Sequence, residues 1–142
     1  MSNQLARRSN GNPPQEARRV VRRITKPRMW QYDYLMLREI AAGLKRQAAA
    51  LNGKASLEIL DVGCKYTPYR EFFAARASRY VGMDLSPYHG VAVRGDALAL
   101  PFRSESFDLI LCTQACYLMA DFRNVLAELV RVARPDGRNI LT

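Results

Sequence analysis

Apolar residues recur with a helical period in three parts of this chain. Between residues 30 and 51 they return at three- and four-residue steps, which predicts an amphipathic helix ended by an Asn-Gly pair. A second helix is predicted at residues 68–77, where Thr67 precedes a proline in the manner of an N-cap. A third is predicted at residues 121–134, with Asp121 as its N-cap and an apolar stripe facing a sheet.

Between these helices the apolar residues form short runs without helical spacing. The longest runs are continuous, which is typical of parallel strands that are covered on both faces. Glycine, proline and acidic residues bound the runs and indicate turns. The predicted strands lie at residues 57–62, 80–84, 91–96, 107–112 and 138–142.

The order strand, helix, strand, strand, helix, strand predicts an α/β fold, a Rossmann-like three-layer open sheet that is mostly parallel, with an N-terminal helix. We divide the chain into a basic flexible arm at residues 1–28, the N-terminal helix at 29–55 and the α/β domain at 56–142. Because the sequence ends within the fifth predicted strand, we expect a domain truncated there. The exposed strand would be an edge at which a second chain could add.

Charge is concentrated in the arm. The chain of 142 residues has a net charge of +9, and residues 1–28 hold eight cations and one acid, 8 − 1 = +7. We interpret the arm as a solvated terminus without a partner, or alternatively as a contact to nucleic acid or an acidic membrane surface. Aromatic residues would favour nucleic acid, but none occurs before Trp30.

Composition narrows the class of protein. Hydrophobic residues make up 49% of the chain, which fits a globular domain, and no apolar run approaches the roughly 18 residues that span a bilayer. The basic N-terminus lacks the apolar segment of a secretory signal. Cys64, Cys112 and Cys116 have neither disulfide nor zinc spacing, so we expect reduced thiols, no metal site and a cytoplasmic protein.

Acidic residues end three of the predicted strands. Asp61, Asp84 and Asp96 each come at the carboxyl end of an apolar run, and Asp84 follows Asp61 by 84 − 61 = 23 positions. An acid about 20 residues after the first strand is the usual partner of ribose hydroxyls in dinucleotide-type folds. Ligands of open α/β sheets bind at these strand ends, so the acids predict a nucleotide-type site.

Four segments in this order and spacing resemble class I S-adenosylmethionine-dependent methyltransferases of the type 11 group. After Asp61-Val62-Gly63-Cys64 that family usually continues Gly-x-Gly, and this chain has Lys65 and Thr67 instead. Residues 126–137 resemble the family's helix before the fifth strand, with Asp136 where glycine is usual. The four segments are residues 59–64, 80–84, 95–102 and 106–112.

The resemblance implies S-adenosyl-L-methionine as cofactor, bound at the carboxyl ends of the first three strands. Asp61 and Gly63 would lie beside its methionine part, and Asp84 would accept hydrogen bonds from the ribose hydroxyls. Asp96 would receive the adenine amino group, while the Ala97 backbone N–H would meet a ring nitrogen. The family's chemistry needs orientation rather than an acid or base, so we predict no catalytic residue.

The resemblance also implies roles around the adenine and the methyl group. Leu85 would press on the adenine face, Cys112 and Gln114 would floor the methyl-donor site, and Cys64 follows the family's motif. The predicted function is a methyltransferase with the acceptor left open; the alternative is a degenerate, noncatalytic module acting through protein or nucleic-acid contacts. The predicted cofactor-binding residues are Asp61, Gly63, Cys64, Asp84, Leu85, Asp96, Ala97, Cys112 and Gln114.

Overall fold

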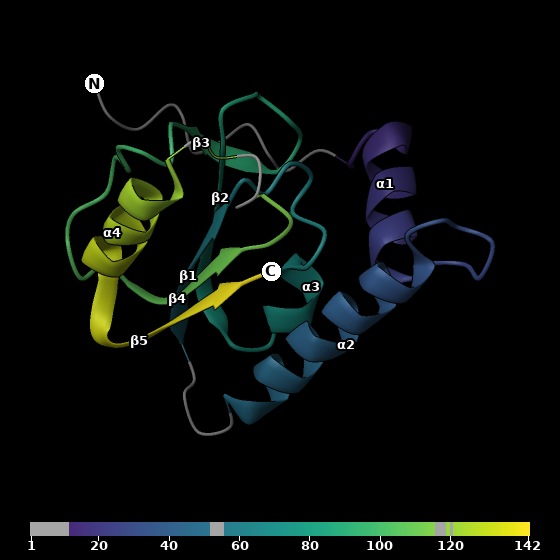
Figure 1. Cartoon of the computed structure of the whole chain (residues 1–142), viewed down its shortest axis with the longest axis horizontal. Helices are drawn as coiled ribbons and strands as arrows, with labels where there is room; N and C mark the ends of the chain where they lie inside the picture. Colours follow the sequence, from purple (N-terminus) through teal and green to yellow (C-terminus); the bar gives the residue numbers. More distant parts are fainter. Residues whose placement is uncertain (1–11, 52–55, 116–118, 120) are drawn as a thin grey trace.

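The computed structural model describes residues 12–51, 56–115, 119 and 121–142. Within them the chain forms helices and strands in alternation (Figure 1). In chain order these are α1 (Gln15–Thr25), α2 (Tyr34–Ala50), β1 (Leu57–Val62), α3 (Arg70–Phe73), β2 (Ala77–Asp84), β3 (Val91–Arg94), β4 (Phe107–Cys112), α4 (Phe122–Val132) and β5 (Ala133–Leu141).

The strands form one sheet in the order β3-β2-β1-β4-β5. Every pair of neighbouring strands is parallel. The chain runs outward from β1 to β3 on one side and from β4 to β5 on the other, so the direction of winding reverses between β1 and β4. This confirms the predicted Rossmann-like α/β fold, and such a reversal point is where open α/β sheets bind ligands.

Alternating residues of the two central strands supply two cores. Leu60 of β1 and Ile110 of β4 face α4, whereas Ile59 and Leu109 face the side covered by α2 and α3, and all four are fully buried. Figure 1 shows α4 on one side of the sheet, α2 and α3 on the other, and α1 against the outer end of α2. The three layers follow from strands that are apolar on both faces.

Helix α4 forms as its pattern predicts. Its N-cap, Asp121, accepts a hydrogen bond from the backbone N–H of Asn124 through its side chain, at 3.2 Å. Val125, Leu129 and Val132 are buried at helical spacing against the sheet. The chain then enters β5 directly at Ala133, five residues earlier than predicted, because the Pro-Asp-Gly turn forms a bulge within the strand.

The predicted flexible arm is wrong for residues 15–25, which form α1. Ala17 and Ile24 lie seven residues apart on one face of this helix, Ala17 is buried, and Ile24 packs against the core under α2. Glu16 accepts a hydrogen bond from the Tyr66 hydroxyl at 3.2 Å. The apolar spacing was present in the sequence but was hidden among arginines; residues 1–11 of the predicted arm lie outside the described residues.

Helix α2 begins at Tyr34, four residues later than predicted, and its predicted stop at residues 52–53 lies outside the described residues. Trp30 belongs to the preceding turn, where Gln31 Oε1 accepts from the backbone N–H of Arg28 at 2.7 Å, and the indole is exposed. At 17 residues α2 is the longest described helix, and none of the described helices is long and apolar enough to cross a membrane.

The helix predicted at residues 68–77 shrinks to the single turn of α3. Thr67 is not its N-cap, because its φ is 49° and Tyr69 occupies the cap position. Residues from Ala77 onward pair with β1 instead, starting with the N–H of Leu57 that donates to Arg76 O at 2.8 Å. Strand pairing therefore overrides the helical pattern and extends β2 three residues earlier than predicted.

Core packing by α4 can be tested with two neighbouring residues of that helix. We expect Leu129→Ala to lower the free energy of unfolding by about 2–5 kcal/mol, because it leaves a cavity against the sheet. The matched control is Val130→Ala, whose side chain is 65% exposed and whose effect should stay within about 0.5 kcal/mol. Urea unfolding followed by circular dichroism measures both; equal losses would contradict the packing described.

Candidate functional site

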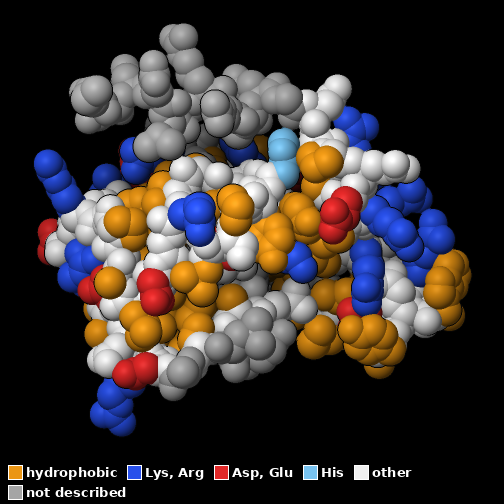
Figure 2. Space-filling model, turned by 90° about the horizontal axis from the view of Figure 1, so that it is seen from above, with side chains coloured by type: hydrophobic (Ala, Val, Ile, Leu, Met, Phe, Trp, Pro, Cys, Tyr) orange, Lys and Arg blue, Asp and Glu red, His pale blue; other side chains and the backbone are white. Residues whose placement is uncertain are grey.

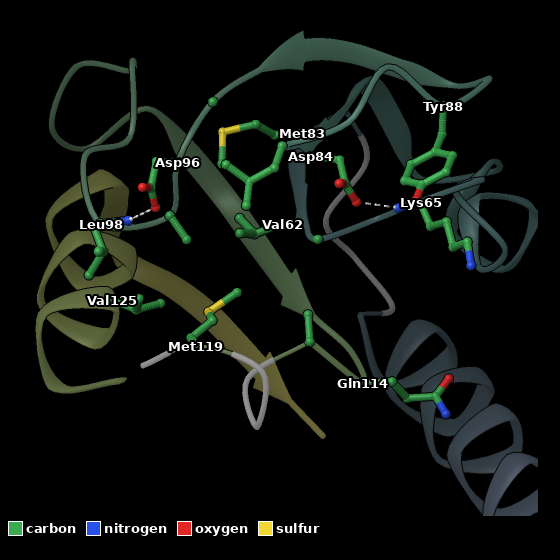
Figure 3. A pocket seen from close by; sticks show the side chains of 15 residues that line it. Val62, Lys65, Met83, Asp84, Tyr88, Asp96, Leu98, Gln114, Met119 and Val125 are labelled. Carbon is green, nitrogen blue, oxygen red and sulfur yellow. Dashed lines mark hydrogen bonds between the residues drawn. The ribbon is translucent and has the colours of Figure 1, made fainter. Parts of the chain in front are cut away.

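A cavity of about 530 Å³ lies at the carboxyl ends of β1 and β2 (Figure 3). It is bounded by the turn after β1, the loops after β2 and β3, the segment after β4 and the start of α4. It therefore lies at the reversal point of the sheet. Its lining residues are Val62, Gly63, Lys65, Met83, Asp84, Leu85, Tyr88, Gly95, Asp96, Ala97, Leu98, Gln114, Ala115, Met119 and Val125.

The turn after β1 needs glycine at its first position. Gly63 has a φ of 69°, and a Cβ built there would lie 2.5 Å from the Cβ of Ala115, the residue that follows β4 by three positions. Its N–H donates to Met83 O of β2 at 2.9 Å. The bare backbone at position 63 thus lets the ends of β1, β2 and β4 meet at one point.

Lys65 stands where the methyltransferases that the sequence resembles usually have glycine, and its backbone has the left-handed conformation, with φ 46°. Its N–H donates to Asp84 Oδ2 at 2.9 Å. Its side chain extends away from that carboxylate (Figure 3) and places Nζ 5.6 Å from the ring centre of Tyr88. The ammonium is therefore held by aromatic faces rather than by the acidic group of the cavity.

Two separate carboxylates, with Val62 and Met83 between them, supply the acceptors of the cavity (Figure 3). Asp84 holds the turn of Lys65 with Oδ2 and the N–H of Ser86 with Oδ1, at 3.1 Å. Asp96 Oδ1 accepts from the N–H of Leu98 at 2.9 Å. Because a carboxylate has about four lone-pair positions, each group can still accept bonds from a ligand after these contacts.

A charged clamp holds the wall that carries Asp96. Arg131 of α4 donates to Leu100 O at 3.0 Å and to Phe102 O at 2.9 Å. Glu128 pairs with Arg131 at 2.6 Å and accepts from the N–H of Leu100 at 2.7 Å. The side chains of α4 therefore hold the loop after β3 through backbone groups of the loop, so these contacts do not depend on the loop's side chains.

The walls between the two carboxylates are apolar. Leu85 is 65% exposed and Leu98 is 45% exposed at the cavity, and Val62 and Met83 lie deeper. Uncovered leucines beside an acceptor pair fit a flat, partly apolar group with hydroxyl or amino donors, as a nucleoside presents. Among the described residues, no three His, Cys, Asp or Glu side chains come together as metal ligands.

Asp61 lies behind the turn rather than in the cavity. It is 1% exposed, its Oδ2 accepts from the Tyr80 hydroxyl at 2.6 Å, and its Oδ1 has no hydrogen-bond partner among the described residues. Burial raises the pKa of this carboxyl to about 7; the Tyr80 hydrogen bond opposes that rise, and the charge of Asp84 adds to it. Buried polar atoms usually have a hydrogen-bond partner, so the unpaired oxygen beneath the turn after β1 could accept a hydrogen bond from a polar ligand group.

The structure brings six of the nine predicted residues to the cavity and leaves three outside it. Asp61, Cys64 and Cys112 are buried beneath the lining. Burial also raises the pKa of the Cys64 thiol, which keeps it protonated. Cys116 lies outside the described residues. The six that line the cavity are Gly63, Asp84, Leu85, Asp96, Ala97 and Gln114; that they hold the cofactor stays a prediction.

Gln114 lines the cavity with its backbone side. Its side chain points away (Figure 3), and its Oε1 accepts from the Tyr69 hydroxyl at 3.2 Å. Sequence reasoning missed several other lining residues. Strand alternation could have indicated Val62, which follows Asp61 in β1, and Met83, which precedes Asp84 at the end of β2. Tyr88 and Met119 lie on loops, where no such alternation exists.

Comparison with known families agrees with this geometry. The family model described as "Methyltransferase domain" matches residues 60–141, which is more than half of the chain. The match starts within β1, ends at the last residue of β5, and includes α3, α4 and the strands β2 to β5 in full. It does not include α1 or α2.

Individual relatives agree as well. The chain is 56% identical over 101 residues to the phthiotriol/phenolphthiotriol dimycocerosates methyltransferase of Mycobacterium tuberculosis, which covers 61% of this chain and 36% of the relative. A similar enzyme of Mycobacterium ulcerans is 50% identical over 106 residues, covering 65% and 38%. The crystal structure of the YcgJ protein from Bacillus subtilis matches with a TM-score of 0.62 at 25% identity, covering 70% of this chain and 49% of that one.

The close contact at Gly63 predicts a selective loss of stability. Gly63→Ala should lower the free energy of unfolding by more than about 2 kcal/mol, because the new Cβ meets Ala115 and alanine disfavours positive φ. Gly43→Ala is the matched control: position 43 lies within α2, and a Cβ there meets its nearest atom at 3.8 Å. That change should raise stability by about 0.5–1 kcal/mol. Denaturant unfolding checks both signs, and a stabilised Gly63→Ala protein would contradict the contact.

The buried carboxyl of Asp61 predicts a pH dependence of stability. Its pKa is about 7 in the fold against 3.8 when unfolded, so between these values the folded protein binds the extra proton. The contribution of this carboxyl to the free energy of unfolding should therefore be largest below pH 4. It should fall by about 4 kcal/mol as the pH rises to about 7.

The Asp61→Asn variant isolates this group, because asparagine keeps an acceptor for Tyr80 but does not ionise. We expect urea unfolding measured from pH 4 to pH 8 to show a smaller decline in the variant than in the unmodified chain. Parallel pH profiles for the two proteins would show that Asp61 titrates as it does in water.

Proposed function

The chain belongs to the class I S-adenosylmethionine-dependent methyltransferases of the type 11 group, and from this premise we propose that its cavity binds S-adenosyl-L-methionine for methyl transfer. The observation that carries the proposal is that Asp84 and Asp96 line one cavity with Val62 and Met83 between them (Figure 3) and with the exposed side chains of Leu85 and Leu98 in the same lining. A nucleoside needs acceptors for its ribose hydroxyls and its amino group, and apolar contact for its ring.

Each part of the cofactor has a proposed partner. Asp84 would accept from the ribose hydroxyls, and Asp96 from the adenine amino group. Leu85 and Leu98 would flank the ring. Gly63 would let the backbone approach the methionine part, and the unpaired Oδ1 of Asp61 beneath it offers an acceptor for the amino group, directly or through water.

Methyl transfer requires of the chain's residues mainly that they bind and orient the cofactor. When bound, the cofactor supplies a methyl group activated by a sulfonium. The residues of the cavity bind and orient it, and the apolar walls exclude water from the reacting side. His89, the sole histidine, lies in a separate hollow between α1 and the turn after β1 rather than in the cavity, which agrees with a reaction that needs no base from this domain.

The acceptor is proposed from the relatives. The mycobacterial enzymes are named for methylating phthiotriol and phenolphthiotriol dimycocerosates, and we propose an acceptor of that kind for this chain. The chain spans only about a third of the length of those relatives, 36% for the Mycobacterium tuberculosis enzyme. Cofactor binding and methyl transfer are therefore tested separately.

The noncatalytic alternative is not favoured, because the matching family model is described as a methyltransferase domain and the mycobacterial relatives are named as methyltransferases. It differs from the proposal in a measurable way. A degenerate module would transfer no methyl group, whether or not it binds the cofactor product S-adenosylhomocysteine, whereas a working methyltransferase would both bind and transfer.

Calorimetric titration with S-adenosylhomocysteine tests the cavity. Asp84→Asn should weaken binding by about 10- to 100-fold, because it removes the charge of the proposed acceptor for the ribose hydroxyls. A hydrogen bond to a charged group contributes about 1.5–3 kcal/mol. The matched control is Asp136→Asn, an exposed acid of β5 outside the cavity, which should bind as the unmodified chain does. Circular dichroism verifies that both variants fold.

Binding heat that is absent, or that is equal in the Asp84→Asn protein, would overturn the assignment of the cavity. Transfer of a labelled methyl group to phthiotriol dimycocerosate, measured in the same preparations, then tests the acceptor. Binding without transfer would retain the cofactor site and reject catalysis by this chain alone.

A further inference from the structure

Helix α1 has two different faces. Ala17 is buried, and Val21 and Ile24 are partly buried towards α2 and the turn after β1. The opposite side is strongly basic and exposed. Its four arginines line a hollow of about 600 Å³ together with Gln15, Lys26, Arg28 and Gln31; the arginines are Arg18, Arg19, Arg22 and Arg23.

The turn after α1 and the start of α2 expose an unusual amount of apolar surface. Trp30 is 78% exposed and Tyr32 is 94% exposed. Of the ten exposed large hydrophobic residues in the described part of the chain, five fall between positions 29 and 36. These five are Met29, Trp30, Tyr32, Leu35 and Met36.

The basic and apolar residues form one surface. The guanidinium of Arg28 lies 5.3 Å from the Trp30 ring centre, and that of Arg23 lies 5.7 Å from the Tyr32 ring centre. Figure 2 shows Lys and Arg side chains gathered at the end of the molecule where Figure 1 places α1, with hydrophobic side chains beside them. Residues 12–36 carry six cations and two acids, 6 − 2 = +4. We call residues 15–36 the basic-aromatic face.

We propose that the basic-aromatic face binds the surface of an anionic lipid bilayer. The cations of α1 would meet lipid phosphates, and Trp30 and Tyr32 would lie at the level of the headgroups, where such rings are enriched. The aliphatic residues Met29, Leu35 and Met36 would enter the acyl boundary. They argue for lipid over nucleic acid, because bases stack on aromatic rings and phosphates pair with cations, and neither uses an exposed aliphatic side chain.

The basic-aromatic face and the cavity share no lining residue. None of the face's exposed apolar residues lines the cavity, and the family match begins after the face, at residue 60. Vesicle binding can therefore succeed or fail whatever the outcome of the cofactor titration.

Vesicle sedimentation with the full chain tests the proposal, and Trp30 is a built-in probe because it is the only tryptophan of the chain. With vesicles of phosphatidylcholine containing phosphatidylglycerol, we expect the protein to sediment and the Trp30 emission to shift to shorter wavelength. With phosphatidylcholine alone, or at high salt, both signals should fall strongly.

Two pairs of charge reversals separate the face from general basicity. Arg19→Glu with Arg22→Glu should lower the partition coefficient by at least about tenfold. Arg123→Glu with Arg138→Glu makes the same change in net charge at exposed positions elsewhere and should have a much smaller effect. Leu35→Ser with Met36→Ser should reduce the emission shift while circular dichroism stays unchanged.

Three results would overturn the proposal. The first is no sedimentation with anionic vesicles, and the second is equal loss in the two charge-reversed proteins. The third is capture by single-stranded polyuridylate in preference to vesicles, with the emission of Trp30 changing only there, which would assign the face to nucleic acid.

Discussion

The contact between Gly63 and Ala115 is the constraint on which the site depends. At this point the turn after β1 crosses the segment after β4, and no room exists for a side chain on position 63. The N–H groups of Gly63 and Cys64 both donate to Met83 O, which ties the same turn to β2. The carboxyl ends of β1, β2 and β4 thereby meet at the turn after β1, and the cavity lies beside these strand ends. A parallel sheet supplies the strand ends, but this close approach sets their spacing.

Asp84 both stabilises that turn and lines the cavity. Its carboxylate orients Lys65 and Ser86 through their N–H groups and still faces the cavity with its remaining lone pairs. This arrangement explains how the chain departs from its family's glycine at position 65. The backbone keeps the left-handed conformation at a cost of about 1–2 kcal/mol, and the side chain leaves the cavity to lie against Tyr66 and Tyr88.

The sequence predicted the sheet and the acidic strand ends well, because both depend on period and order along the chain. Strand β4 has the predicted bounds, and Asp121 caps α4 as its residue type indicates. Asp61 lies beneath the lining rather than in it, because alternate residues of a strand face opposite sides and Val62 takes the cavity side; its contact with the cofactor stays a prediction. Helix α1 was missed since its arginines dominate the composition, and loop residues such as Tyr88 follow no period at all.

A short series of contacts connects the basic helix with the cavity. Glu16 of α1 accepts from the Tyr66 hydroxyl, the rings of Tyr66 and Tyr88 lie 5.2 Å apart, and Tyr88 lines the cavity. Helix α1 therefore packs against the turn after β1, which borders the cavity, rather than on a distant part of the fold. A bilayer bound by the basic-aromatic face would therefore lie against the helix that contacts this turn. The proposed membrane surface is thus connected to the proposed cofactor cavity by contacts within the fold.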